Sequence, residues 1–301
     1  MSKSSSGGSH VSDRAKEERR LGWKLAGPAF VIMVLVTFYP ILQAVYSSLF
    51  KHRLTDPGGQ RFVFLENYLI ILRDPLWWQA FGTTAFITVV TVVVELVLGF
   101  LIALAMAKII LGRGLLRTVV LIPYSIITVV SAFSWLYAFA TDTGFVDPLL
   151  HSLSFGAFPK DFNWFGGFWT SMVPICVSEI WKTTPFMSLL LLAGLTQIDS
   201  AMEEAAIVDG ATWGERMRRV VLPNMKSAIM VALLFRTLDA FRIFDNIFIM
   251  TAGSHDTASL SLVAYNQTIS RTEVGLGSAV SVLLFLCVVI IAVIFVKGFR
   301  V

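Results

Sequence analysis

Six long apolar runs recur along this chain and constrain its fold more than any other feature. They cover roughly residues 22–50, 81–107, 116–140, 168–195, 227–251 and 276–297. A helix of about 20 apolar residues crosses the ~30 Å hydrocarbon layer of a bilayer. With 56% hydrophobic and 15% charged residues, the chain lacks the polar surface that a soluble domain of this size needs. We therefore expect an all-α integral membrane protein with six transmembrane helices.

The two ends of the chain differ in composition from the apolar runs. Residues 1–20 are rich in Ser and Gly and then in mixed charge, which predicts a mobile N-terminal arm followed by one transmembrane domain over 21–301. The first apolar run is too long for a cleavable signal, and we expect it to remain as the first helix. Cys176 and Cys287 both fall in apolar runs, where they behave as small hydrophobic residues and suggest neither a disulfide nor a metal site.

Positive charge is divided unequally between alternate loops. The N-terminal arm, the loops after the second and fourth runs and the C-terminal tail hold fifteen Lys and Arg residues, against six in the other loops. Short loops with the larger number of Lys and Arg residues stay in the cytoplasm. The distribution predicts that both termini and the loop between the fourth and fifth runs are cytoplasmic, although solvated basic loops without any partner account for most of these charges.

The polar loop over residues 196–223 predicts a short helix. Ser200 and Glu203 have the spacing of a capping box, in which the hydroxyl and the carboxylate bind free backbone N–H groups. Gly210 supplies a left-handed stop about two and a half turns later. The expected helix therefore covers residues near 201–209.

The residues of this helix suit contact with another protein. Ala205 and Ala206 give it a slim face that can enter a groove, and Glu204 adds a carboxylate that can pair with a cation across an interface. Pro223 is expected to end the basic segment that follows. The alternative is an amphipathic helix that lies on the lipid surface, which the three arginines of that segment would favour.

The same loop resembles the cytoplasmic coupling loop of ABC-importer permeases, written EAA-x3-G-x9-I-x-L-P, with Val220 in the Ile place. The resemblance implies that these residues couple the chain to an ATPase: Glu203, Glu204, Ala205, Ala206, Asp209, Gly210, Leu222 and Pro223. It extends over roughly residues 25–298 and is similar to the carbohydrate-uptake branch, the maltose and glycerol-phosphate type. Within that branch, residues 236–246 are most similar to the first permease of actinobacterial trehalose importers.

The resemblance implies a fold, an activity and a set of partners. The fold would be that of type I importer permeases. The chain would work with a second permease, two copies of an ATPase subunit and an external sugar-binding lipoprotein, in a bacterial plasma membrane. It carries no Walker lysine loop, so ATP and Mg would bind to the ATPase subunits and this chain would hold no cofactor or metal. It would move a sugar, a disaccharide such as trehalose, by alternating access between two rigid arrangements.

Ionisable residues concentrate in two of the apolar runs. Inside a membrane such groups are costly and indicate function. Three pairs spaced three apart can each meet on one helix face: Glu179 with Lys182, Arg236 with Asp239, and Arg242 with Asp245. Pro185 would free backbone carbonyls near the first pair. The alternative is mutual neutralisation that merely permits burial.

The resemblance also implies which residues line the sugar pathway. In maltose-type permeases the lining falls around the equivalent of that proline and on the first half of the fifth helix. The matching positions here are Glu179, Lys182, Thr183, Phe186, Met187, Arg236, Ala240 and Ile243, and Asp239 lies on the same stretch. Carboxylates and guanidinium groups can bind sugar hydroxyls, and an aromatic ring offers a stacking face.

Two other classes of function are open to such a chain. A proton-driven secondary transporter would use Glu95, in the second run, together with the charged residues of the fourth and fifth runs. That class predicts inverted internal repeats, which the sequence does not display. A membrane anchor or enzyme is the other class, and it would need a nucleophile with its base or a metal cluster, which we do not find.

Overall fold

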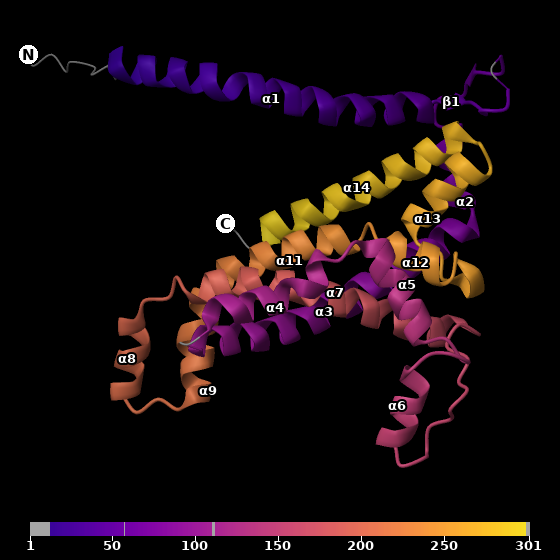
Figure 1. The fold of residues 1–301 in the computed structure, drawn as a ribbon. Coiled ribbons are helices and arrows are strands. Elements are labelled where there is room, and N and C mark those ends of the chain that lie inside the picture. Colours follow the sequence, from indigo (N-terminus) through magenta and orange to yellow (C-terminus); the bar gives the residue numbers. More distant parts are fainter. Residues whose placement is uncertain (1–12, 57, 110–111, 299–301) are drawn as a thin grey trace, which may run out of the picture.

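The computed structural model describes residues 13–56, 58–109 and 112–298 and is built almost entirely of helices (Figure 1). Of the arm predicted over 1–20, residues 1–12 lie outside the described residues, and 13–20 form the start of the first helix. The elements in chain order are α1 (Asp13–Ser48), β1 (Phe50–Lys51), β2 (Arg61–Phe62), α2 (Glu66–Arg73), α3 (Pro75–Lys108), α4 (Arg113–Ser125), α5 (Thr128–Ala138), α6 (Val146–Leu153), α7 (Phe168–Leu195), α8 (Ser200–Val208), α9 (Trp213–Arg216), η1 (Met217–Val221), α10 (Leu222–Asn224), α11 (Lys226–Ala240), α12 (Asp245–Met250), η2 (Ser254–Asp256), α13 (Leu260–Tyr265), η3 (Asn266–Ser270) and α14 (Val274–Gly298). The two short strands pair antiparallel.

Helices occupy all six of the apolar runs. Over the described residues, four helices are long and apolar enough to cross a membrane, namely α3, α7, α14 and the part of α1 from Arg20 to Ser48. The third run is divided between α4 and α5, which meet at an angle of 84° and count as a fifth span if taken together. The fifth run is divided between α11 and α12. The prediction of continuous helices is therefore wrong for the third and fifth runs.

The two divisions have different causes. Pro123 lies in the last turn of α4 and has no N–H to extend it, and Ile126 is already extended, with ψ 137°. Between α11 and α12 no proline or glycine is present, and serine hydroxyls take the carbonyl groups that the break frees. Ser259 Oγ donates to Ile243 O at 2.9 Å, and Ser261 Oγ donates to Arg242 O at 3.2 Å. Side-chain donors thus replace the helical hydrogen bonds.

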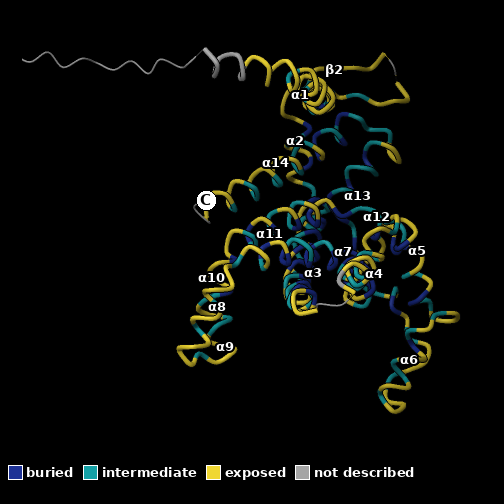
Figure 2. The backbone as a smooth tube through the Cα atoms, turned by 60° about the vertical axis from the view of Figure 1, so that its left-hand side comes forward, coloured by how far each residue is buried: buried dark blue, intermediate teal, exposed yellow. Residues whose placement is uncertain are grey.

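The centre of the bundle is the packing of α3 against α7, with α11 beside both. The buried residues gather there, whereas α1, α6, α8 and α9 are largely exposed (Figure 2). Close approach depends on small residues. Gly99 of α3 lies against Met187 and Ser188 of α7, and Gly194 of α7 lies against Ala228 of α11. A Cβ atom placed on Gly194 would lie 2.4 Å from the Ala228 Cβ, so this position admits no side chain without a shift of the helices.

The packing at Gly194 leads to a stability prediction. Gly194→Leu should force α7 and α11 apart and lower the free energy of unfolding by about 1–3 kcal/mol, as overpacking does elsewhere. Thermal unfolding of the purified chain in detergent measures the effect. Gly82→Leu is the matched control, because nothing lies within 4 Å of a Cβ on that glycine of α3. Equal unfolding temperatures for the two variants would contradict the prediction.

Candidate functional site

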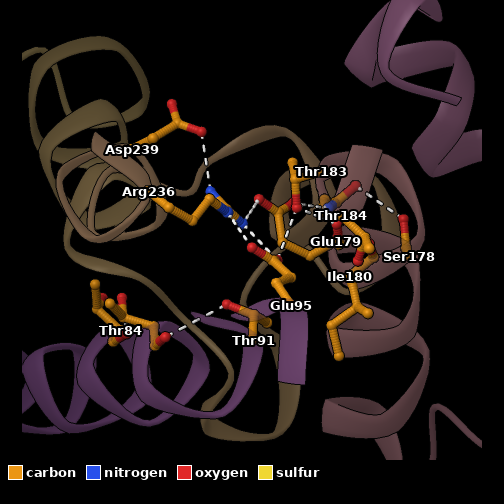
Figure 3. Close-up of polar contacts among 12 residues, drawn as sticks. Thr84, Thr91, Glu95, Ser178, Glu179, Ile180, Thr183, Thr184, Arg236 and Asp239 are labelled. Atoms are coloured by element: carbon orange, nitrogen blue, oxygen red, sulfur yellow. Dashed lines mark hydrogen bonds and ion pairs between the residues drawn. The ribbon is translucent and has the colours of Figure 1, made fainter. Parts of the chain in front are cut away.

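A buried cluster of charged residues lies where α3, α7 and α11 meet. Arg236 of α11 is only 1% exposed and its guanidinium contacts three carboxylates (Figure 3). Its Nε and Nη2 donate to the two oxygens of Glu95 at 2.5 and 3.0 Å. Nη2 also donates to Glu179 Oε1 at 2.7 Å, and Nη1 donates to Asp239 Oδ2 at 2.9 Å. One cation thus joins three helices.

The two carboxylates that are most buried have a donor for each oxygen. Thr183 Oγ1 donates to Glu95 Oε1 at 2.7 Å, and Asn246 Nδ2 donates to Glu179 Oε2 at 2.6 Å. Buried ions are tolerated only when they are paired and their remaining lone pairs are satisfied. Glu95 and Glu179 meet that condition, so they and Arg236 form a closed structural network.

A cavity of about 410 Å³ opens beside this network, within the ~300–1,000 Å³ that small-molecule sites usually occupy. Five residues of the predicted pathway line it, namely Glu179, Lys182, Thr183, Asp239 and Ile243. The lining also includes Tyr124, Thr128, Arg242, Phe244, Asp245 and Asn246. The cavity is therefore bordered by acids, cations and aromatic rings from α4, α5, α7, α11, α12 and the 241–244 segment.

Four residues of the predicted pathway do not line this cavity. Met187 and Ala240 are buried in the apolar core between α3, α7 and α11. Arg236 lies behind the carboxylates that it holds. Phe186 stacks on Tyr124, with ring centroids 5.2 Å apart, so it supports a lining residue.

Only one of the three predicted ion pairs forms. Arg236 pairs with Asp239, but among residues 13–56, 58–109 and 112–298 no salt bridge joins Glu179 to Lys182 or Arg242 to Asp245. Lys182 Nζ instead donates to Ile126 O at 2.7 Å, a carbonyl that the break between α4 and α5 leaves free. Arg242 Nε donates to Leu238 O. Residue spacing predicts which charged side chains can meet on one helix, but it does not predict the partners that they find on other helices.

Sequence reasoning missed the lining residues Tyr124, Thr128, Phe244 and Asn246. Tyr124 and Thr128 flank the division between α4 and α5, and Pro123 was a signal for that division. Phe244 and Asn246 flank the division of the fifth run, which has no Pro or Gly to mark it. Both sides of the cavity are thus formed where an apolar run is interrupted.

The predicted coupling loop forms a separate site that projects from one end of the bundle as α8 and α9 (Figure 1). The predicted short helix over 201–209 is present as α8, and Gly210 follows it with φ +79°. The predicted capping box at Ser200 is wrong. Asp199 is the N-cap, and its side chain accepts from Ala201 N at 2.9 Å, since aspartate caps a helix as well as serine does.

A capping box does occur in the next turn of the loop. Thr212 Oγ1 accepts from Glu215 N, and the Glu215 carboxylate accepts from the N–H and hydroxyl of Thr212. These hydrogen bonds to the charged form lower the pKa of Glu215 below its ordinary value. Pro223 does not end the basic segment as predicted. It lies at the start of α10, where a missing N–H costs nothing, and the turn follows at Met225.

The surface of α8 is not covered by the rest of this chain. None of its nine residues is buried, and Met202, Ile207 and Val208 are 46%, 54% and 87% exposed. Glu204 and Ala205 are exposed as well. Exposed apolar residues that gather on one short helix indicate a contact surface for another molecule.

The charged residues of the described ranges do not form a metal site, since no group of three or more His, Cys, Asp or Glu there is placed to hold a metal ion. The chemistry that the cavity supports is hydrogen bonding and stacking. Carboxylates accept from hydroxyl groups, while Lys182 and Arg242 donate.

Comparison with known proteins places the chain in a family. Residues 95–300 match the model of the binding-protein-dependent transport system inner membrane component. The trehalose transport system permease protein SugA of Mycobacterium tuberculosis is 49% identical over 286 residues, which cover 94% of this chain and 89% of that protein. The trehalose/maltose transport system permease protein MalF of Thermococcus litoralis is 36% identical over 282 residues, which cover 93% of this chain and 94% of that protein.

Solved structures support the same fold. A chain of the bacterial alginate ABC transporter, in complex with an alginate-bound periplasmic protein, superposes with a TM-score of 0.79 at 18% identity and covers 94% of this chain and 95% of its own length. The arrangement of helices is thus that of a type I ABC importer permease. The chain belongs to the family of inner-membrane components of binding-protein-dependent transport systems.

Proposed function

We propose that this chain is the permease subunit of an ATP-driven importer that carries a sugar, a disaccharide such as trehalose, into the cytoplasm. The observation that supports this most directly is the cavity of about 410 Å³, which places acids, cations and aromatic rings together among membrane-spanning helices. Charged and polar side chains among membrane-spanning helices cost free energy, so their presence around a cavity indicates that a polar solute binds there. The relatives named above are permeases of trehalose and of trehalose and maltose transport systems.

The charge around the cavity favours an uncharged solute. Among the residues that line it, Glu179, Asp239 and Asp245 contribute three negative charges, while Lys182 and Arg242 contribute two positive charges. The net of one negative charge repels anions such as sugar phosphates. Hydroxyl groups, in contrast, can both donate to Asp239 and accept from Lys182 or Arg242. A neutral polyhydroxylated molecule meets these requirements, and the Tyr124 and Phe244 rings offer faces on which a sugar ring can stack.

The proposed assembly contains a second permease, two ATPase subunits and an external sugar-binding protein. Both termini and the α8–η1 segment would face the cytoplasm, as the positive charges of the loops predict. The exposed helix α8 would then enter a groove of an ATPase subunit, which binds ATP and Mg. Closure of the ATPase pair on ATP would move α8 and turn the membrane helices outward to accept sugar, and hydrolysis would return them to the inward arrangement. The relatives give no support to a proton-driven mechanism.

The test of this coupling role is to enlarge the slim face of α8. Ala205→Trp should prevent close seating and lower sugar-stimulated ATP hydrolysis by the purified complex by about tenfold, if overpacking costs roughly 1–3 kcal/mol at the interface. Ala157→Trp is the matched control, because Ala157 is also exposed but lies in the loop after α6. Normal stimulation in Ala205→Trp would reject the coupling role of α8.

A further inference from the structure

A second cavity, of about 290 Å³, lies between the ends of two membrane-spanning helices and the α8–η1 segment. Its apolar wall includes Leu104 near the end of α3, Leu195 at the end of α7 and Val221 of η1. Its polar residues are Lys108, Glu203, Trp213 and Arg216. It is therefore amphipathic, and it lies at the ends of α3 and α7.

Arg216 is held in this cavity without a protein acceptor for its inner nitrogen. Its Nε is buried and has no hydrogen-bond partner among the residues that the structure describes. A buried donor without an acceptor costs about 1–3 kcal/mol, and more when it is charged. Buried polar groups nearly always have a partner, so this guanidinium is suited to an acceptor from a molecule outside the chain.

The other charged residues leave the cavity with a positive balance. Lys108, in the last turn of α3, has no hydrogen bond or ion pair with any described residue. Glu203 of α8 forms a salt bridge with neither Lys108 nor Arg216 over the same residues. Two cations against one carboxylate favour an anionic ligand.

The apolar wall and the polar residues of the cavity together indicate which kind of anion binds there. An inorganic phosphate would use the cations but would leave the apolar wall uncovered. A phospholipid covers both, because its phosphate can pair bidentately with a guanidinium while its glycerol and first methylene groups lie on leucine and valine. The Trp213 ring of the same cavity, 57% exposed, is typical of the membrane interface.

We propose that this cavity binds an anionic phospholipid, with its phosphate between Arg216 and Lys108. A hydroxyl group of the lipid headgroup would donate to the Glu203 carboxylate, so the lipid would connect α8 to the ends of α3 and α7. Helix α8 packs chiefly against α9 and η1 and otherwise projects from the bundle (Figure 1). Lipid in the cavity would thus stabilise the position of α8 relative to the membrane-spanning helices.

Native mass spectrometry of the purified full chain tests the proposal, with phosphatidylglycerol or phosphatidylcholine added. We expect phosphatidylglycerol to bind and phosphatidylcholine to bind much more weakly. Arg216→Gln and Lys108→Gln should each weaken phosphatidylglycerol binding by about fivefold to tenfold, the effect of one lost charge near a lipid phosphate. Arg218→Gln is the matched control, because Arg218 is exposed and outside the cavity.

The same measurements can overturn the proposal. The proposal fails if Arg216→Gln binds phosphatidylglycerol as tightly as the parent chain does. It also fails if Arg218→Gln weakens phosphatidylglycerol binding as much as Arg216→Gln does, or if the two lipids bind equally. A thermal shift with inorganic phosphate alone, lost in Arg216→Gln, would assign the site to a free anion instead. Should Arg216→Gln fail to fold, Arg216→Lys keeps the charge but not the bidentate geometry, and weaker phosphatidylglycerol binding is expected from that variant too. Loss of ATPase-subunit binding with lipid binding unchanged would assign Arg216 to the protein interface.

Discussion

Arg236→Ala is expected to destabilise the whole helical bundle rather than transport alone. Removal of the guanidinium leaves the buried carboxyl groups of Glu95 and Glu179 without their cation and hydrogen-bond donor, and they are 0% and 7% exposed. Breaking a buried ion pair by removing one partner costs about 3–5 kcal/mol, a large share of the stability of a typical domain. We expect little folded protein from this variant, and a lowered unfolding temperature for what can be purified in detergent.

Two further variants separate the burial of charge from the loss of side-chain volume. Arg242→Ala removes a cation at the same end of the fifth run, but that side chain is exposed and bonds only a backbone carbonyl among the described residues, so the expected effect is below about 1 kcal/mol. Replacing Arg236 by Met together with Glu95→Gln and Glu179→Gln removes all three buried charges and should recover much of the lost stability. A stable Arg236→Ala variant would show that the network does not hold the helices together.

The location of the helices could be predicted from the sequence because hydropathy alone determines it. All six apolar runs contain helices, since a backbone in lipid must satisfy its own hydrogen bonds. The divisions of the third and fifth runs could not be located in the same way. Lys182 and Ser259 satisfy the carbonyls of Ile126 and Ile243 that these divisions expose, and each partner lies 16 or more residues away in the chain.

The candidate site could be predicted only where its geometry is local to one helix. The pair Arg236 and Asp239 follows from a spacing of three residues, and the structure confirms it. The pairing of Arg236 with Glu95 joins residues separated by 141 positions, and nothing in the spacing of either residue indicates the other. For the same reason Arg236 was predicted to line the pathway, whereas the structure places it behind Asp239. The sequence shows which residues carry a charge, but it does not show which of these charged groups face the cavity.

Asp239→Asn is expected to impair transport without loss of stability, in contrast to Arg236→Ala. Arg236 fixes one oxygen of the Asp239 carboxylate, and the other has no hydrogen bond to a described residue. The side chain is 66% exposed and lines the larger cavity. It is therefore a fixed, available acceptor for a solute hydroxyl. A hydrogen bond to a charged group contributes about 1.5–3 kcal/mol, which corresponds to a decrease of roughly 10–100-fold in the uptake rate at sugar concentrations well below saturation.

Uptake into vesicles that contain the assembled complex and ATP measures this decrease, and thermal unfolding of the same preparation should stay within about 1 kcal/mol of the parent. Asp142→Asn, at an exposed aspartate in the loop between α5 and α6, is the matched control. Glu179→Gln makes the opposite comparison, because both of its oxygens already accept from Arg236 and Asn246; its main effect should be on stability. If Asp239→Asn transports normally, the solute does not depend on this carboxylate, and Asp239 serves only as a partner of Arg236.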